Sequence, residues 1–368
     1  MNRIGFIVNP IAGMGGAVGL KGTDGRETYL KAVSLGARPI APKRAEAFLS
    51  EIKSLEKNVE IYSGAASMGE YNAERCGFKP RVVGERKEET SSEDTKKTAS
   101  MMKDLQVDIL VFCGGDGTSR DIYDAIDTSI PVLGIPAGVK MYSAVFSTTP
   151  LSAARVVSKF LRGSLPLKEA EVLDADEESI RRGELKVRLY GYLLTPYEPS
   201  LTQGTKVSTL LTEDEMLNQL GIAKYVVEEM EPEVIYVVGP GTTTREILGL
   251  LGEEKTLLGV DIIKNRKIIA KDATEKEIIE LIKDKKSKII VSPIGGQGFI
   301  FGRGNLQISD KVIREIGKEN IIVVATKEKL NNLKVLRVDT GDPELDLSFK
   351  GFIRVISDYR EERVVMVE

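Results

Sequence analysis

Four apolar, strand-like runs in this chain of 368 residues stop abruptly at glycine-bearing loops, and this feature constrains the fold more than any other. The runs end at Val8, Cys113, Val238 and Ile294. Segments with helical spacing alternate with them, and residues 43–55, for example, place their apolar side chains on one helix face. Alternating strands and helices predict a mostly parallel sheet that helices cover on both faces. We therefore expect an α/β fold.

The same periodicities locate the individual elements. The strands that we expect in the N-terminal half are residues 4–9, 59–62, 107–113 and 131–135. The helices that we expect there are residues 43–55, 91–105, 118–126 and 151–161. Residues 184–195 predict a longer strand, and the α/β alternation resumes at Val234. The last segment predicts a hairpin that turns at residues 359–362.

Charge and apolar content exclude several classes of protein. The net charge is −3, so the chain carries no overall basic field that would attract nucleic acid or an anionic membrane. No apolar run approaches the ~18 residues that a membrane span needs, and the N-terminal segment lacks the features of a secretory signal. We therefore expect a cytoplasmic protein that binds neither nucleic acid nor membrane.

The chain contains no histidine, which limits the chemistry that it can perform. Ser-His-Asp catalysis and His-ligated zinc are excluded, so any general base must be Asp, Glu, Lys, Tyr or Cys. The two cysteines, Cys76 and Cys113, are too few for a disulfide framework or a Cys-based metal site. Cys113 belongs to an apolar strand, where we expect a buried and unreactive thiol.

The segment "VFCGGDGTS" ends the strand at 107–113 and presents a carboxylate among glycines. Gly114 and Gly115 permit a tight turn, which leaves Asp116 at the start of the next helix. A carboxylate there can accept a proton from a hydroxyl group, or hold Mg²⁺ directly or through water. Thr118 can cap the helix or bind a phosphate. The alternative is that Asp116 is only a turn residue or a helix cap.

Two glycine loops in the second half also suit a ligand. "VGPGTTTREIL" combines Gly239, Gly241 and Thr242 at a predicted strand-to-helix junction, and it resembles the phosphate loop of ribose-5-phosphate isomerases. The alternative for this loop is a capped helix start. "GGQGFIFGRGN" combines glycines with side-chain donors, and Arg303 can hold a phosphate or carboxylate through two hydrogen bonds. The predicted binding residues of this second loop are Gly295, Gly296, Gln297, Gly298, Arg303 and Asn305.

The first strand and the GGDG loop together resemble the superfamily of NAD kinases, diacylglycerol kinases, sphingosine kinases and phosphofructokinases. In those enzymes an Asn-Pro-x-Ser/Ala-Gly loop and the GGDG loop hold the nucleotide phosphates, and the resemblance makes Asp116 the catalytic residue. It assigns nucleotide binding to Asn9, Pro10, Gly13, Gly114, Gly115, Gly117 and Thr118. A third loop, residues 134–146, matches in position only and supplies Lys140 and Tyr142 as substrate-binding candidates.

Seven segments spread over nearly the whole chain resemble the archaeal and AcoX-like branch of the ATP-NAD kinase family. They are "GLKGTDG", "FCGGDGTSRDI", "GIPAGVKMYSAVF", "VVGPGTTTREI", "LLGVDII", "SPIGGQGFIFGRGN" and "LRVDTGDPELD". The resemblance implies a phosphofructokinase-like N-terminal sheet, ATP as phosphoryl donor, Mg²⁺ or another divalent cation, an NAD-like acceptor and a homo-oligomer. Two departures concern the acceptor. The Asn-Glu pair with which NAD kinases bind the dinucleotide has no convincing equivalent, and residues 234–326 predict α/β rather than mostly β structure.

We expect two domains and a C-terminal extension. Residues 1–150 form the N-terminal, Rossmann-like nucleotide-binding domain with the GGDG loop. Residues 151–335 form a second, mixed α/β domain that contributes the acceptor site. The strands within 336–368 pack back on one of these domains.

The acidic segment "DTGDPELD" has two interpretations. It brings Asp339, Asp342, Glu344 and Asp346 close together in the sequence, but it is too short for an EF-hand loop. It is either a polar turn in which Asp residues cap a helix, or a site for Mg²⁺ or a ribose hydroxyl.

These features predict an ATP-dependent phosphotransferase with the adenosine ribose 2′-hydroxyl of NAD as acceptor. Asp116 acts as the base, and Lys140, Arg303 or the loop around Lys21 neutralises charge on the transferred phosphoryl group. Two alternatives stay open: a kinase of another small polyol or sugar, and a nucleotide or sugar-phosphate sensor without catalysis. Polyphosphate in place of ATP as the donor also stays open.

Overall fold

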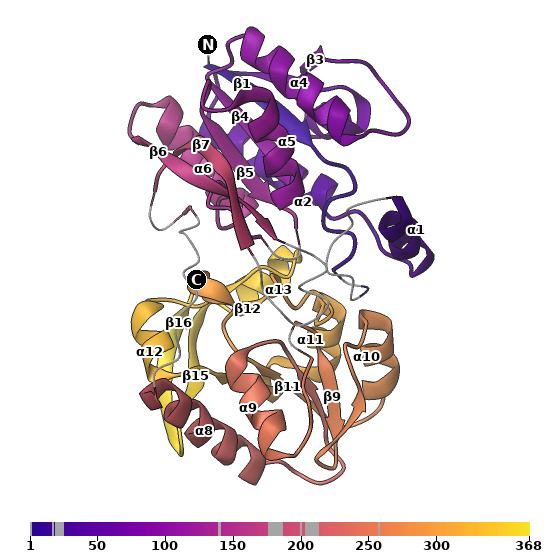
Figure 1. Cartoon of the computed structure of the whole chain (residues 1–368), viewed down its shortest axis with the longest axis vertical. Coiled ribbons are helices and arrows are strands. Elements are labelled where there is room, and N and C mark those ends of the chain that lie inside the picture. Colours follow the sequence, from indigo (N-terminus) through magenta and orange to yellow (C-terminus); the bar gives the residue numbers. More distant parts are fainter. Residues whose placement is uncertain are drawn as a thin grey trace. The chain divides into compact units, whose positions relative to one another are not determined.

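The computed structural model describes residues 2–16, 18, 26–138, 141–175, 187–198, 201–202, 213–256 and 258–368. The chain forms two compact units (Figure 1). Unit 1 contains Met1–Gly15 and Lys21–Lys206, and unit 2 contains Gly16–Leu20 and Val207–Glu368. Both units have α/β architecture, as the sequence predicts. No helix within the described ranges is long and apolar enough to cross a bilayer.

Unit 1 is built on a parallel five-stranded sheet. Its order is β3 (Arg81–Val83), β2 (Val59–Gly64), β1 (Asn2–Val8), β4 (Ile109–Gly114) and β5 (Val132–Pro136). All neighbouring strands run parallel. The chain passes from β1 through β2 to β3 and then returns to the other side of β1 as β4. The strand order therefore reverses between β1 and β4, and in open α/β sheets such a reversal creates a crevice at the carboxyl ends of the strands.

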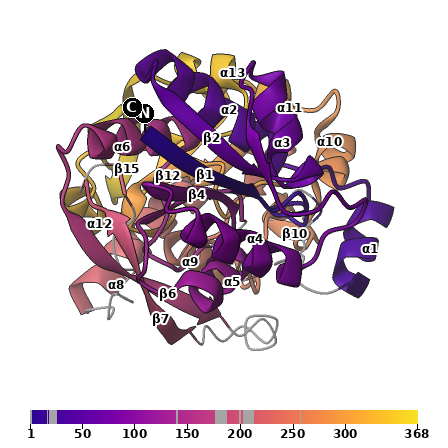
Figure 2. The same ribbon diagram turned by 90° about the horizontal axis from the view of Figure 1, so that it is seen from above.

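Side chains of β1 alternate between two cores, one on each face of this sheet. Phe6 stacks on Phe48 with a ring-centroid distance of 5.8 Å, whereas its neighbour Ile7 packs into the opposite core. The covering helices, seen on the two sides of β1 in Figure 2, are α2 (Ala41–Leu55) with α6 (Pro150–Leu161), and α4 (Ser92–Asp104) with α5 (Asp116–Ile126). The shorter elements of unit 1 are α1 (Arg26–Ser34), η1 (Ala66–Met68) and α3 (Glu70–Arg75).

A long antiparallel hairpin of β6 (Leu167–Ala175) and β7 (Val187–Pro196) completes unit 1. Strand β7 corresponds to the longer strand predicted at residues 184–195. Gly191 of β7 lies against Tyr123 of α5, because a Cβ at Gly191 would be 2.3 Å from the phenol ring. The hairpin therefore packs directly on the helix that follows the GGDG loop.

The two units divide after Lys206, whereas the sequence places the domain boundary at residue 150. The difference has a physical reason. Helix α6 buries Val157 in the core beneath α2, and the hairpin buries Val172 in the core beneath α5. Both elements therefore complete the cores of unit 1 instead of opening the next domain.

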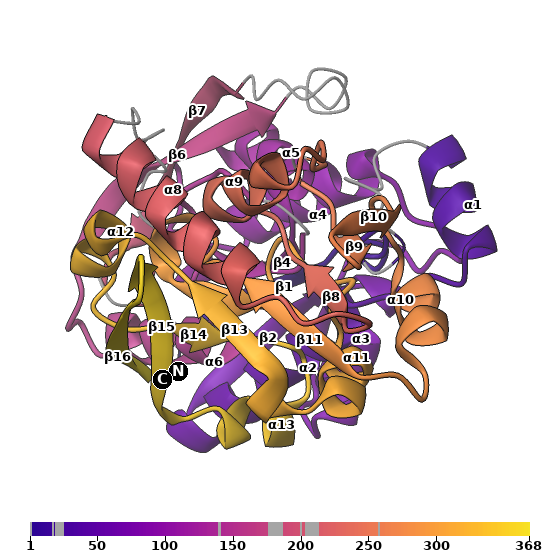
Figure 3. The same ribbon diagram turned by 90° about the horizontal axis from the view of Figure 1, so that it is seen from below.

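Unit 2 is built on a mixed seven-stranded sheet (Figure 3). Its order is β10 (Lys267–Ala270), β9 (Asp261–Lys264), β8 (Ile235–Val238), β11 (Ser287–Val291), β13 (Ile321–Val324), β15 (Gly351–Asp358) and β16 (Glu361–Val367). Strands β8, β11, β13 and β15 run parallel, and β9, β10 and β16 join the sheet through antiparallel pairs. The chain leaves β8 toward β9 and β10 and returns on the other side as β11. This sheet therefore also reverses its strand order, between β8 and β11.

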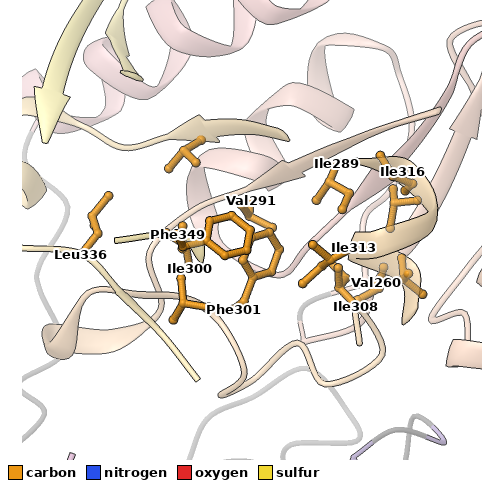
Figure 4. Close-up of a cluster of buried hydrophobic side chains, with 14 of the residues drawn as sticks. Val260, Ile289, Val291, Ile300, Phe301, Ile308, Ile313, Ile316, Leu336 and Phe349 are labelled. Carbon is orange, nitrogen blue, oxygen red and sulfur yellow. The ribbon is translucent and has the colours of Figure 1, made fainter. Parts of the chain in front are cut away.

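Helices cover both faces of the second sheet. They are α8 (Glu213–Glu228) with α9 (Thr242–Leu250) on one face, and α10 (Glu275–Ile282) with α11 (Asp310–Ile316) on the other. Figure 4 shows the core of the second face, where Ile289 and Val291 of β11 pack with Ile313 and Ile316 of α11. The remaining elements are η2 (Gly295–Gln297), β12 (Phe299–Phe301), η3 (Lys318–Asn320), α12 (Lys327–Asn332), β14 (Arg337–Val338) and α13 (Pro343–Ser348).

The C-terminal strands belong to unit 2. Strands β15 and β16 extend its sheet as a hairpin, with the turn between Asp358 and Glu361 where the sequence predicts it. Val355 and Val367 lie in the same core as β11 and α11. The α/β structure predicted for residues 234–326 is confirmed.

A substitution at Gly134 of β5 tests how tightly unit 1 is packed. A Cβ at this position would lie 2.3 Å from the Phe146 ring and 3.0 Å from the Phe112 ring. Because both rings are fully buried, we expect Gly134→Ala to lower the free energy of unfolding by about 1–3 kcal/mol, measured by urea unfolding.

The control adds the same methyl group at Gly249 of α9, where a Cβ would meet no atom within 4 Å. Gly249→Ala should leave stability unchanged or raise it, since Ala favours the helix over Gly. A Gly134→Ala protein that unfolds at the wild-type urea concentration would show that this core is not closely packed.

Candidate active site

Asn9 joins two loops at the carboxyl edge of the unit 1 sheet, where the strand order reverses. Its side-chain amide donates to Thr118 Oγ1 at 2.9 Å, and its Oδ1 accepts from the Ile11 amide at 3.2 Å. Its own amide donates to the Cys113 carbonyl at 2.9 Å. The structure therefore brings together the loop after β1 and the GGDG loop, which the sequence predicted as partners.

Glycine is required where these loops touch. A Cβ at Gly114 would lie 2.4 Å from Thr118 Oγ1, and one at Gly13, where φ is 81°, would lie 2.0 Å from the Ala137 carbonyl oxygen. A Cβ at Gly115 would be 3.4 Å from the Gly138 Cα. The remaining predicted nucleotide-binding residues, both half-buried, are Pro10 in the turn after β1 and Gly117 in the first turn of α5.

Asp116 anchors the loop that follows β5. Its Oδ2 accepts from the Tyr142 amide at 2.7 Å, and its Oδ1 accepts from the Ser143 amide at 2.9 Å. It is the first residue of α5, where the helix dipole favours a negative charge. These contacts tie the loop after β5 to the first turn of α5, at the edge where the strand order reverses.

Two other candidate bases at this edge are unsuited to that role. Burial, with a smaller contribution from the Asp116 charge, raises the pKa of Tyr142 to about 12. Burial also raises the pKa of Cys113 to about 12, and its thiol donates to the Ala41 carbonyl at 3.3 Å. The prediction of a buried Cys113 is confirmed. Both groups stay protonated near neutral pH, and Lys140 lies outside the described residues.

The first predicted loop of unit 2 follows β8 and opens α9. The Gly239 amide donates to the Ile290 carbonyl of β11 at 2.9 Å. Gly241 is the N-cap residue, with φ of 145°. The Thr244 hydroxyl lies 2.8 Å from the Gly239 carbonyl oxygen and 3.0 Å from that of Gly241, which holds the loop in shape. Thr242 is exposed, and its hydroxyl accepts from Gln219 at 3.2 Å.

The second predicted loop of unit 2 has an exposed tip and a closed base. Gly295 and Gly296 are exposed, whereas Gly298 is buried. The Arg303 guanidinium donates to Gln297 Oε1 at 2.9 Å. It also lies over the ring of Phe299, with 5.1 Å between the guanidinium carbon and the ring centroid.

Asn305, a predicted binding residue, shapes this loop from within. Its side chain is buried, donates to the Ile300 carbonyl at 2.9 Å and accepts from the Gly302 amide at 3.1 Å. Gly302 itself packs against backbone, since a Cβ there would lie 2.0 Å from the Asp339 carbonyl oxygen. Some glycines of this loop therefore allow its backbone to pack closely, and others form its exposed tip.

A buried ion pair at the same edge of unit 2 was not singled out from the sequence. Lys255 Nζ lies 3.4 Å from Asp261 Oδ2, with side chains 1% and 0% exposed. Asp261 also accepts from Thr256 and from the Asp272 amide. Asp261 pairs with Val238 at the carboxyl end of β8, so the network adjoins the Gly239 loop. The one sequence signal was a carboxylate in front of the apolar run of "GVDII".

The acidic segment near the C-terminus follows the polar-turn interpretation. Asp342 caps α13 by accepting from the amides of Glu344 and Leu345, and it pairs with Arg314 at 2.6 Å, which lowers the pKa of Asp342. Asp346 accepts from the Thr340 amide and hydroxyl. These carboxylates are engaged in holding the turn and the helix start.

Two domain models of one family match the chain. A model of the ATP-NAD kinase N-terminal domain matches residues 4–165, and a model of the ATP-NAD kinase C-terminal domain matches residues 231–367. No curated protein matches the chain. One matching solved structure is a protein provisionally described as a diacylglycerol kinase from Bacillus anthracis str. Sterne, at 15% identity and a TM-score of 0.27. That match covers 48% of this chain and 46% of the other, so it spans less than half of that protein.

The buried Lys255–Asp261 pair yields a prediction about stability. Lys255→Met leaves the Asp261 charge buried without its cation, so we expect the free energy of unfolding to fall by about 3–5 kcal/mol. The double variant Lys255→Met with Asp261→Asn removes both charges and should recover part of that loss. Chemical unfolding of the three proteins makes the comparison. Equal stability of the single variant and the wild type would mean that the pair is solvated in solution.

Proposed function

Because the chain belongs to the ATP-NAD kinase family, we propose that it transfers a phosphoryl group from ATP to the adenosine ribose 2′-hydroxyl of NAD, forming NADP. The presence of both family domains supports an ATP-dependent kinase. The observation that carries the proposal is the convergence of Asn9, Asp116 and Thr118 at the carboxyl edge of the sheet, where the strand order reverses between β1 and β4. Ligands of open α/β sheets bind at reversals of this kind.

The loops after β1 and β4 would bind the nucleotide phosphates through backbone amides. Gly13, Gly114 and Gly115 let the backbone come close to a ligand without a Cβ in the way. The Asn9–Thr118 contact keeps the two loops at a fixed separation.

Asp116 would orient the acceptor hydroxyl and take up its proton. A carboxylate accepts about four hydrogen bonds, and the Tyr142 and Ser143 amides take one position on each oxygen. These two bonds hold the carboxylate in one orientation. Phosphoryl transfer has a loose transition state, so catalysis rests mainly on such positioning and on charge neutralisation.

A divalent cation fits this arrangement. Mg²⁺ in nucleotide sites takes one or two carboxylates, with water and phosphate oxygens as its other ligands, and Asp116 is a carboxylate at the crevice. When bound with ATP, Mg²⁺ supplies neutralisation of the phosphate charge. Asp116 would hold it directly or through water.

The acceptor would be bound by the Gly239–Thr242 and Gly295–Arg303 segments of unit 2, the latter through its exposed glycine tip and through Gln297 and Arg303.

A second candidate function keeps the kinase and changes the acceptor to a small polyol or sugar. The absence from the sequence of an Asn-Glu pair like that of NAD kinases favours it. A sensor that binds nucleotide or sugar phosphate without catalysis is the third. The homo-oligomeric state and the cytoplasmic location stay predictions.

Substitution of Asp116 tests the base. We expect Asp116→Asn to lower kcat/KM by about 10²–10⁴-fold, because an amide cannot take up the hydroxyl proton. The exposed Asp104→Asn at the end of α4 is the matched control and should retain activity. Circular dichroism verifies that each variant is folded. Undiminished turnover by a folded Asp116→Asn protein would refute the assignment.

A turnover screen tests the acceptor. The purified chain is supplied with Mg-ATP or polyphosphate and with NAD, NADH, inositol or simple sugars, and phosphorylated products are identified by mass spectrometry. We expect NAD to be phosphorylated. Phosphorylation of a sugar but not of NAD would replace the first proposal by the second, and ligand binding without any turnover would favour the sensor.

A further inference from the structure

The unit 2 sheet repeats the reversal of strand order that unit 1 shows between β1 and β4. Its strand order reverses between β8 and β11, and the loops that follow these two strands meet there. A Cβ at Gly239 would lie 3.2 Å from Val291 Cγ1 and 3.6 Å from Ile308 Cδ1. The loop that opens α9 is therefore packed against the end of β11 and the segment beyond it.

The first turn of α9 offers donors to a negatively charged group. Its N-cap residue is Gly241, no side chain in the described part of the chain caps it, and the first turn contains no acidic residue. The carbonyls of Gly239 and Gly241 are already engaged by the Thr244 hydroxyl. The helix dipole adds a partial positive charge at this end.

A buried hydroxyl lies beside this helix start. Ser292 follows β11 directly, is 2% exposed, and its Oγ has no hydrogen-bond partner among the described residues. A Cβ at Gly241 would be 3.4 Å from the Ser292 Cβ and 3.8 Å from its Oγ, so the hydroxyl borders the N-cap of α9. An unpaired buried hydroxyl destabilises the protein, and a bound group that accepts a hydrogen bond from it would remove that cost.

A carboxylate at this edge of the sheet is compensated by a cation. The closest strand on the other side, β9, begins with the Asp261 carboxylate, opposite Val238. That carboxylate is buried and compensated by Lys255 and by bonds from Thr256 and the Asp272 amide. The edge therefore combines several donors with a neutralised carboxylate, which suits a group with several acceptor oxygens.

We infer that the N-terminus of α9, with the Ser292 hydroxyl beside it, binds a phosphoryl group carried by the acceptor. The site itself stands on the geometry of unit 2, and only the assignment of the phosphoryl group to the acceptor rests on the proposed function. Both a sugar phosphate and the pyrophosphate of a dinucleotide carry this chemistry. On this inference the acceptor is a phosphorylated compound rather than an unphosphorylated polyol or sugar.

The binding test uses hydrogen exchange of the whole protein, with inorganic phosphate against chloride at equal ionic strength. We expect phosphate to slow exchange in peptides that cover residues 239–246. Ser292→Ala should weaken the apparent phosphate affinity at these peptides by about tenfold, because a hydrogen bond to a charged group is lost. The same variant should leave the stability of the ligand-free protein unchanged or higher, since it removes an unpaired hydroxyl.

The matched control is Ser63→Ala, which removes another buried hydroxyl without a partner among the described residues, on β2. It should leave the phosphate response of residues 239–246 unaltered. Exchange that does not respond to phosphate would overturn the site. So would a Ser292→Ala protein with the wild-type phosphate response.

Ribose 5-phosphate and NAD then identify the source of the phosphoryl group, with ribose and adenosine as unphosphorylated controls. Protection by ribose 5-phosphate points to a monoester, and protection by NAD alone points to a pyrophosphate. In turnover, Ser292→Ala should raise KM for the acceptor about tenfold with little change in kcat. If phosphate protects residues 239–246 but Ser292→Ala has the wild-type KM for the acceptor, the link between this site and the acceptor is wrong. If the wild-type protein shows no turnover at all, the proposed function is refuted, but the phosphate site is not.

Discussion

Two hydrogen bonds from the amides of Tyr142 and Ser143 to the Asp116 carboxylate hold the loop after β5 to the first turn of α5 at the carboxyl edge of the unit 1 sheet. Bonds to an ionised acceptor are stronger than bonds between neutral groups, so they can fix a loop that has no regular structure of its own. Asn9 makes the corresponding link from β1 through Thr118. The first turn of α5 is therefore where the loops of three strands are tied together, and the geometry of this edge of the sheet depends on it.

Both sheets place the start of a helix at the reversal of strand order, but the side chains at the two helix starts differ. In each, a helix with a glycine N-cap begins at the reversal of strand order: α5 after Gly115 and α9 after Gly241. Helix α5 presents Asp116 in its first turn, which suits a proton or a cation. Helix α9 has no acidic residue there and has the Ser292 hydroxyl beside it, which suits an anion.

Much of the fold followed from periodicity, because buried strands and amphipathic helices repeat their apolar residues at fixed intervals. The sequence also predicted the GGDG loop and the first strand as partners. The boundary predicted at residue 150 differs from the division after Lys206, because α6 and the β6–β7 hairpin pack back on unit 1. The binding role of Asn305 stays a prediction, and the sequence did not indicate that its amide closes its own loop. Neither the target of a packing face nor the direction of a side chain is encoded locally.

The sequence by itself determined the α/β class, the glycines at the ends of the strands, and the absence of histidine, which limits any general base to Asp, Glu, Lys, Tyr or Cys. Only the tertiary structure decided what these groups touch: Asp116 with the amides after β5, Asp261 with Lys255, and Ser292 with the start of α9. The physical reason is strand order. Which loops meet at the edge of a parallel sheet depends on which strands are neighbours, and local periodicity carries no information about that order.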